Sequence, residues 1–188
     1  MTASLTTAPA DAGEEEMVLR RRGREDSDGH RFQMRQRMIS IGDDYWIEDE
    51  QGRRAFRVDG KALRVRQTFV LEDANGNEVA KIQERKLSVR DKMAIERGGE
   101  SLATVRKALV GIRDRFSIDV AGGDELHAKG NIVDHEYEID RDGQAVARVS
   151  KRWFRVRDTY GVEIAPGEDD ALVLAIAVCV DALSHRGN

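Results

Sequence analysis

The stretch Ala171-Leu-Val-Leu-Ala-Ile-Ala-Val-Cys-Val180 places ten apolar residues in a row near the C-terminus of the chain. Two carboxylates, Asp169 and Asp170, precede it, and acidic side chains in that position accept hydrogen bonds from free backbone N–H groups and suit the positive end of a helix dipole. We therefore predict a helix over about 170–184. A helix that is apolar on every side must be buried on every side.

The predicted helix is short for a membrane span. At about 1.5 Å per residue it measures roughly 22 Å, whereas the hydrocarbon core of a bilayer is about 30 Å thick. A helix in the protein core is therefore favoured over a helix that crosses a membrane. Burying its apolar side chains contributes roughly 10–20 kcal/mol gross, which is comparable with the net stability of a whole domain.

The composition indicates a soluble globular protein with a heavily charged surface. Of the 188 residues, 40% are hydrophobic and 35% are charged, and the formal net charge is −4. This net charge argues against bulk binding of nucleic acid. The single cysteine, Cys179, excludes an internal disulfide and favours a reducing cytoplasm. We expect Cys179 to be a small buried side chain rather than a nucleophile, because it lies within the apolar run.

The beginning of the chain differs in composition from the rest. It combines small residues with the acidic run Glu14–Glu16 and the basic run Arg20–Arg22. Such a segment cannot bury enough apolar area to offset the loss of chain entropy on folding. We predict a disordered charged tail over 1–30 and one domain over 31–188. We expect no secretory signal peptide, because no charged start followed by an apolar core opens the chain.

The apolar residues of the domain alternate with polar ones, as half-buried strands require. A first strand is predicted from Phe32 to Met38. Hairpins, in which two strands flank a polar turn with Gly, are predicted over 45–60, 69–82 and 137–149. Gly98-Gly99 and Gly122-Gly123 are better interpreted as further hairpin turns than as a phosphate-binding loop. Short strands joined by such turns indicate an all-β meander.

An internal repeat relates two parts of the domain. Shifting the chain by 67 positions superposes three pairs of turn and strand residues, Asp73 on Asp140, Gly76 on Gly143 and Ala80 on Ala147. The segment 45–60 matches 116–130 more loosely. We interpret the chain as two related β halves, each unable to close a core alone. The strands must wrap the helix in a closed barrel, because a flat sheet would cover only one side of it and would leave strand edges exposed.

Five motifs, taken together and in order, resemble the LURP-one-related family. They are Ser40–Ile47, Val58–Leu63, Arg113–Phe116, Val149–Phe154 and Arg157–Ala171. The similarity covers about residues 31–185. The resemblance implies a tubby C-terminal-like fold, a closed antiparallel β-barrel of about twelve strands around a central C-terminal helix. It also implies kinship with phospholipid scramblases and with tubby proteins, which are phosphoinositide-binding adaptors. It carries over no catalytic residue, because the matched motifs are structural.

The residues that carry metal or nucleophilic chemistry are scattered along the chain. The four histidines are His30, His127, His135 and His185. His135 lies between two acidic residues, but adjacent residues of a strand point to opposite faces and cannot form one metal cage. We interpret the histidines as solvated. There is no Gly-x-Ser-x-Gly elbow either, so we expect no catalytic residue, no metal and no cofactor.

The best candidate surface is the segment 151–157, which we predict to be a strand. Its outward-facing side chains would be Lys151, Trp153, Arg155 and Arg157. Arginine donates paired hydrogen bonds to phosphate, and tryptophan suits a membrane interface, so these residues are the candidates for a lipid-headgroup site. The favoured alternative is a plain charged surface, on which arginines pair with Asp or Glu across strands.

Three functions are compatible with the sequence. The leading one is a non-enzymatic cytoplasmic module that binds anionic phospholipid headgroups, peripherally at a membrane, or a protein partner. The second is a scramblase-like lipid-handling protein whose apolar helix inserts partly into the membrane. The third is an enzyme with an unidentified pocket. The ligand, the oligomeric state, the biological process and the role of the tail stay open.

Overall fold

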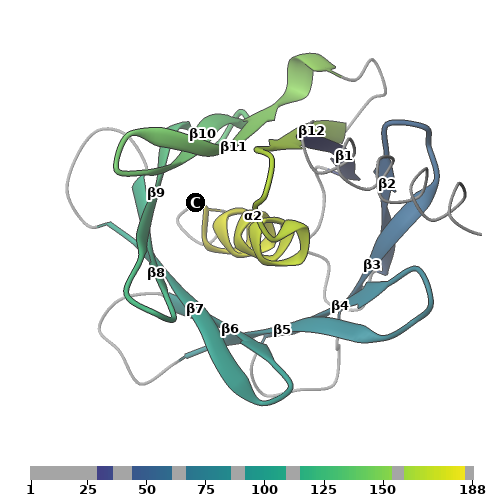
Figure 1. Cartoon of the computed structure of the whole chain (residues 1–188), viewed down its shortest axis with the longest axis horizontal. Helices are drawn as coiled ribbons and strands as arrows, with labels where there is room; N and C mark the ends of the chain where they lie inside the picture. The colour runs from purple at the N-terminus through teal and green to yellow at the C-terminus, as the bar shows by residue number, and fades with distance from the viewer. Residues whose placement is uncertain are drawn as a thin grey trace, which may run out of the picture.

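A computed structural model describes residues 29–35, 44–60, 67–85, 92–108, 115–153 and 159–184. Twelve strands form one closed antiparallel barrel around a helix (Figure 1). Each strand pairs with its neighbours along the chain, and β1 closes the barrel between β12 and β2. Almost all of the predicted tail lies outside the described residues, as do residues 36–38 of the first predicted strand.

The elements follow the order expected of a meander. The strands are β1 (His30–Arg35), β2 (Tyr45–Asp49), β3 (Arg54–Gly60), β4 (Thr68–Asp73), β5 (Glu78–Glu84), β6 (Lys92–Arg97), β7 (Glu100–Lys107), β8 (Arg115–Val120), β9 (Glu125–Asn131), β10 (Glu136–Arg141), β11 (Gln144–Ser150) and β12 (Thr159–Ile164). A 3₁₀ helix, η1 (Lys151–Trp153), follows β11, and the α-helix α2 (Asp170–Ser184) follows β12. The predicted barrel around a C-terminal helix is confirmed, and α2 has the predicted bounds.

The alternation of side chains positions the core, and glycine turns connect the strands. In β1, Phe32 and Met34 point inward and are buried, and they alternate with the polar residues Arg31 and Gln33. Asp142 and Gly143 join β10 to β11, with φ angles of 51° and 83°. Positive φ at both central residues is what a tight two-residue hairpin turn requires, because its twist then matches that of the strands.

The strand register supports two related halves, but the shift that relates them is not 67 positions on every strand. Leu71 pairs with Ala80 in the first half, and Ile139 pairs with Ala147 in the second. Ala147 lies 67 positions after Ala80, as predicted, but Ile139 lies 68 positions after Leu71. The single frame is therefore wrong by one residue on β4 and β10, because the first hairpin is one residue longer. A slip of one residue would have turned the core side chains outward.

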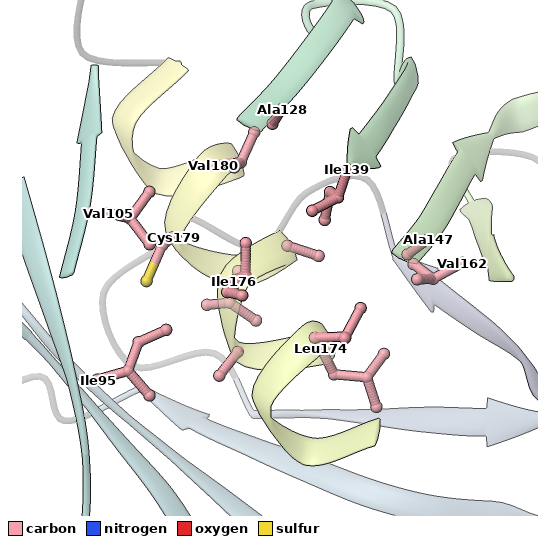
Figure 2. Close-up of a cluster of buried hydrophobic side chains, with 14 of the residues drawn as sticks. Ile95, Val105, Ala128, Ile139, Ala147, Val162, Leu174, Ile176, Cys179 and Val180 are labelled. Atoms are coloured by element: carbon pink, nitrogen blue, oxygen red, sulfur yellow. The ribbon is translucent and has the colours of Figure 1, made fainter. Parts of the chain in front are cut away.

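The helix α2 fills the barrel. Twelve of its fifteen residues are buried, and its backbone comes closest to β5, β6, β7 and β12. Figure 2 shows Cys179 on the side of Ile95 and Val105, while Val180 points toward Ala128. The prediction that Cys179 is a small buried side chain is confirmed. Within the described residues, no helix has both the length and the apolar character needed to cross a membrane.

Charged side chains hold the N-terminal end of α2. Asp169 accepts a hydrogen bond from the backbone N–H of Leu172 at 3.1 Å, which caps the helix as predicted. The guanidinium of Arg97 donates to both oxygens of Asp169, at 2.9 and 3.2 Å. Asp170 lies 2.7 Å from Nδ1 of His30 at the start of β1. These contacts tie the first turn of the helix to β1 and β6.

Candidate functional site

The predicted strand over 151–157 is wrong for its first three residues. The carboxylate of Glu136 accepts hydrogen bonds from Ser150 Oγ at 3.0 Å and from the backbone N–H of Lys151 at 3.2 Å. Ser150 Oγ also accepts one from the backbone N–H of Arg152 at 3.1 Å. These contacts satisfy backbone donors outside the ladder, so the chain leaves the sheet at Ser150 and enters η1.

The structure brings two of the four predicted headgroup residues into η1. Lys151 and Trp153 are partly buried, and the Trp153 ring lies 5.2 Å from the guanidinium of Arg31, a cation–π contact. Arg152, which the strand pattern did not place on the outward face, has a side chain that is 84% exposed. Arg155 and Arg157 lie outside the described residues. The described part of the site is therefore a 3₁₀ turn with cations rather than a strand face.

Elsewhere on the barrel, many arginines pair with carboxylates on neighbouring segments. These pairs include Arg57 with Asp44, Arg85 with Glu96, Arg106 with Asp119, Arg141 with Glu168 and Arg148 with Glu138. Arg31 likewise donates to Glu163 at 2.6 Å. The pairing that we expected of a plain charged surface is present at these arginines, and such partly exposed pairs contribute little to stability.

A buried polar cluster lies inside the barrel near the C-terminal end of α2. Its centre is Asp181, whose surface is 0% exposed, and His135 beside it is 1% exposed. The prediction of a solvated histidine is therefore wrong for His135, which does not belong to a strand. It ends the four-residue turn between β9 and β10 with a φ of 53°, and this left-handed conformation accompanies its inward placement.

The contacts within the cluster are directional. Tyr160 Oη donates a hydrogen bond to Asp181 Oδ2 at 2.9 Å. His135 Nε2 lies 3.0 Å from Asp181 Oδ1, but the two atoms do not have the geometry of a hydrogen bond. The contact between the imidazole and the carboxylate is therefore electrostatic. The His135 ring packs on the Tyr160 ring with centroids 4.3 Å apart. The helix, β12 and the β9–β10 turn meet at this carboxylate.

All three tyrosines of the chain belong to this cluster. Tyr45 on β2, Tyr137 on β10 and Tyr160 on β12 are each buried. Burial raises the pKa of each phenol well above its usual value, and the negative charge of Asp181 raises it further. The phenols therefore stay neutral at physiological pH and can act as hydrogen-bond donors inside the barrel.

One sequence signal could have revealed the cluster. Asp181 follows ten apolar residues within a helix that we predicted to be buried on all sides. A buried carboxylate needs polar partners, because leaving one unpaired is costly. The identity of those partners could not be read from spacing, because they come from three strands and a turn that are far apart in the sequence.

The described residues contain a surface groove but no group of metal ligands. No three His, Cys, Asp or Glu side chains of the described residues are grouped so that they could hold a metal ion. A groove of about 310 Å³ lies where β11 and β12 meet the start of β1. It is lined mostly by small and apolar residues, including Gly29, Ala145 and Pro166, with Arg148 and Glu163 as its charged residues.

Comparisons with known proteins agree with the fold. The structure resembles the X-ray structure of the Arabidopsis thaliana protein AT5G01750 with a TM-score of 0.65 and 18% sequence identity, over 84% of this chain and 93% of that chain. No curated protein is significantly similar to the chain. The family model described as LURP-one-related matches residues 30–181. This match spans the barrel and most of α2, and the chain therefore belongs to the LURP-one-related family.

Proposed function

We propose that this protein is a non-enzymatic cytoplasmic module that binds anionic phospholipid headgroups, peripherally, through η1 on the outside of its barrel. The observation that carries the proposal is that the interior is occupied: α2 fills it, with twelve of fifteen residues buried. Because apolar side chains take up that space, a headgroup would have to bind on the outer surface.

The charge of η1 supports this location. Arg152 is largely exposed, and its Nε lies 3.6 Å from Glu136, which is a loose contact. Lys151 makes no ion pair with any residue in the described part of the chain. The outward arginines of the strands form closer ion pairs, as the distance of 3.0 Å between Arg148 and Glu138 illustrates. Cations that lack a close carboxylate are the ones available to a phosphate group.

The proposal that the module is not an enzyme rests on the buried cluster. Asp181, His135 and the tyrosines are all withdrawn from solvent, with exposed fractions of 0–7%. A catalytic acid or base must come within hydrogen-bond reach of its substrate. Their burial favours a structural role for these side chains.

The test is sedimentation of the purified protein with vesicles. Neutral phosphatidylcholine vesicles and vesicles that also contain phosphatidylserine are compared at low and physiological salt. We expect binding only to the anionic vesicles, weakened by salt because the attraction is screened. Substituting Lys151, Arg152, Arg155 and Arg157 together by alanine should abolish the binding.

A matched control removes four cations that are paired with carboxylates, Arg57, Arg85, Arg106 and Arg148. This control variant has the same net charge as the test variant and should retain most of the binding. If both variants lose it equally, general charge rather than η1 is responsible. Binding that survives a high-salt wash would favour the insertion alternative, and an absence of binding to anionic vesicles would direct attention to a protein partner.

A further inference from the structure

The contacts of α2 divide it into halves that are held in different ways. Its interior-facing residues Leu174 and Ile176 pack in an apolar environment, which opens only at the cost of exposing that surface. Its C-terminal half carries Asp181, which contacts Tyr160 and His135. The strand ladder is closed without the helix, so the helix can move without breaking any strand pairing.

The two halves differ in what they gain from water. Exposing Leu174 and Ile176 brings no compensation, because their side chains have no polar groups to hydrate. Opening the C-terminal half also exposes Val178, Val180 and Leu183, but it returns a carboxylate, an imidazole and phenols to solvent, and the hydration free energy regained there offsets part of the cost. The left-handed backbone of His135 is also relieved if its turn opens. Opening should therefore begin at this end of the helix.

We propose that Asp181, His135 and Tyr160 form a latch that gates a local opening of the C-terminal half of α2 while the barrel stays folded. When the latch is closed, the Tyr160 hydroxyl and the His135 ring hold Asp181 in place. When it opens, the last turns of α2 and the β9–β10 turn separate from each other. The exposed side chain of Val133 lies in that turn, so a contact made outside the barrel can act on the latch. This inference does not depend on what the outer surface binds.

The single cysteine of the chain provides the readout. Cys179 is fully buried and lies two residues before Asp181, in the half that the latch controls. Burial raises the pKa of its thiol, so the thiol reacts slowly in the closed state. An aromatic disulfide reagent reacts with the exposed thiolate and releases one coloured thiolate for each mixed disulfide formed. When labelling is slower than closing of the helix end, the labelling rate reports the population of the open state.

The experiment compares two variants by labelling rate and by global stability in urea. Tyr160→Phe removes the donor to Asp181 from the closed state only, so we expect labelling of Cys179 to rise about tenfold. Leu174→Ala destabilises the folded barrel, but Leu174 stays packed in the locally open state. Its labelling rate should therefore stay within about twofold of wild type despite a lower urea midpoint. Labelling of the wild type should depend only weakly on urea.

The opposite pattern would overturn the proposal. If Leu174→Ala speeds labelling in proportion to its loss of global stability, and labelling depends on urea as steeply as unfolding does, then Cys179 is reached only by global unfolding. Amide hydrogen exchange of the wild type is an independent check that needs no variant to fold. The amides of residues 178–184 should exchange by a local opening and those of 172–176 only by global unfolding, and uniform exchange along α2 would refute the latch.

Discussion

The two ends of α2 use the same residue type in opposite ways. At the N-terminal end, Asp169 and Asp170 face Arg97 and His30, and the side chains of these four residues are 24–46% exposed. At the C-terminal end, Asp181 and His135 have side chains that are only 1% exposed. One end of the helix is therefore held by charges in water, and the other by polar groups in the protein core.

The C-terminal end of α2 depends on exact geometry more than the N-terminal end does. Exposed ion pairs are screened by salt and tolerate small displacements, so they are worth little individually. A buried carboxylate is stabilised only while its partners stay in place, and losing one partner leaves an uncompensated group. The N-terminal end of α2 should thus respond to salt and acid, and the C-terminal end to substitution and to alkali.

The largest expected effect is alkaline unfolding through the tyrosines. Their raised folded pKa means that the unfolded state releases phenolic protons first, near pH 10, while the folded state keeps them. Stability is therefore intact below pH 10 and is lost as the pH rises above it, by about 1.4 kcal/mol per pH unit for each phenol that stays neutral in the fold. With three such phenols, the folded state should collapse within a few pH units.

This prediction is measured by phenolate absorbance and circular dichroism on the same samples. Because the chain has three tyrosines and all are buried, no phenol should titrate near pH 10 while the C-terminal end of α2 is closed. Trp46→Phe, which changes an aromatic residue outside the cluster, should give the same curve. A phenolate signal that appears near pH 10 in folded protein would show that the C-terminal end of the helix is open to solvent.

The next largest effect is that of Asp181→Ala. It removes the acceptor of the Tyr160 hydroxyl and the charge beside His135, and it leaves a cavity. We expect a loss of about 3–5 kcal/mol in the free energy of unfolding, measured by urea denaturation. Asp181→Asn, which keeps the volume and one acceptor, should lose less. A cost no greater than that of removing Asp169 would erase the contrast between the two ends.

The barrel and its helix could be predicted because their signals are local. Period-two alternation, glycine turns and a ten-residue apolar run each indicate the backbone conformation and the burial of the residues that form them. The one-residue error in the repeat frame also has a local cause, because the two hairpin turns differ in length and a turn residue has no alternation to count. Alternation also predicts a strand at residues 151–153, but the carboxylate of Glu136 accepts a hydrogen bond from the Lys151 N–H and this segment forms η1 outside the sheet.

The buried cluster could not be predicted because its signals are not local. Tyr45, Tyr137 and Tyr160 each look like an ordinary inward-facing strand residue, and nothing in their spacing indicates that they surround one carboxylate. The sequence predicts a strand at His135, whereas its position depends on a left-handed turn. The sequence signal for the cluster is a charged residue within a helix that must be buried. This signal identifies Asp181 but not its partners.

The smallest effect tests the N-terminal end. Burial alone would raise the pKa of Asp169, but hydrogen bonds from Arg97 and from the Leu172 N–H hold it below its usual value. Asp169 therefore contributes stability at neutral pH that is lost as the pH falls through its folded pKa. Asp169→Ala should cost about 1 kcal/mol at pH 7, the usual value of a helix cap. The difference from wild type should vanish in acid and shrink in high salt, as urea denaturation at each condition would show. A difference that is independent of both would mean that Asp169 acts through packing, and the two ends of α2 would then differ only in burial.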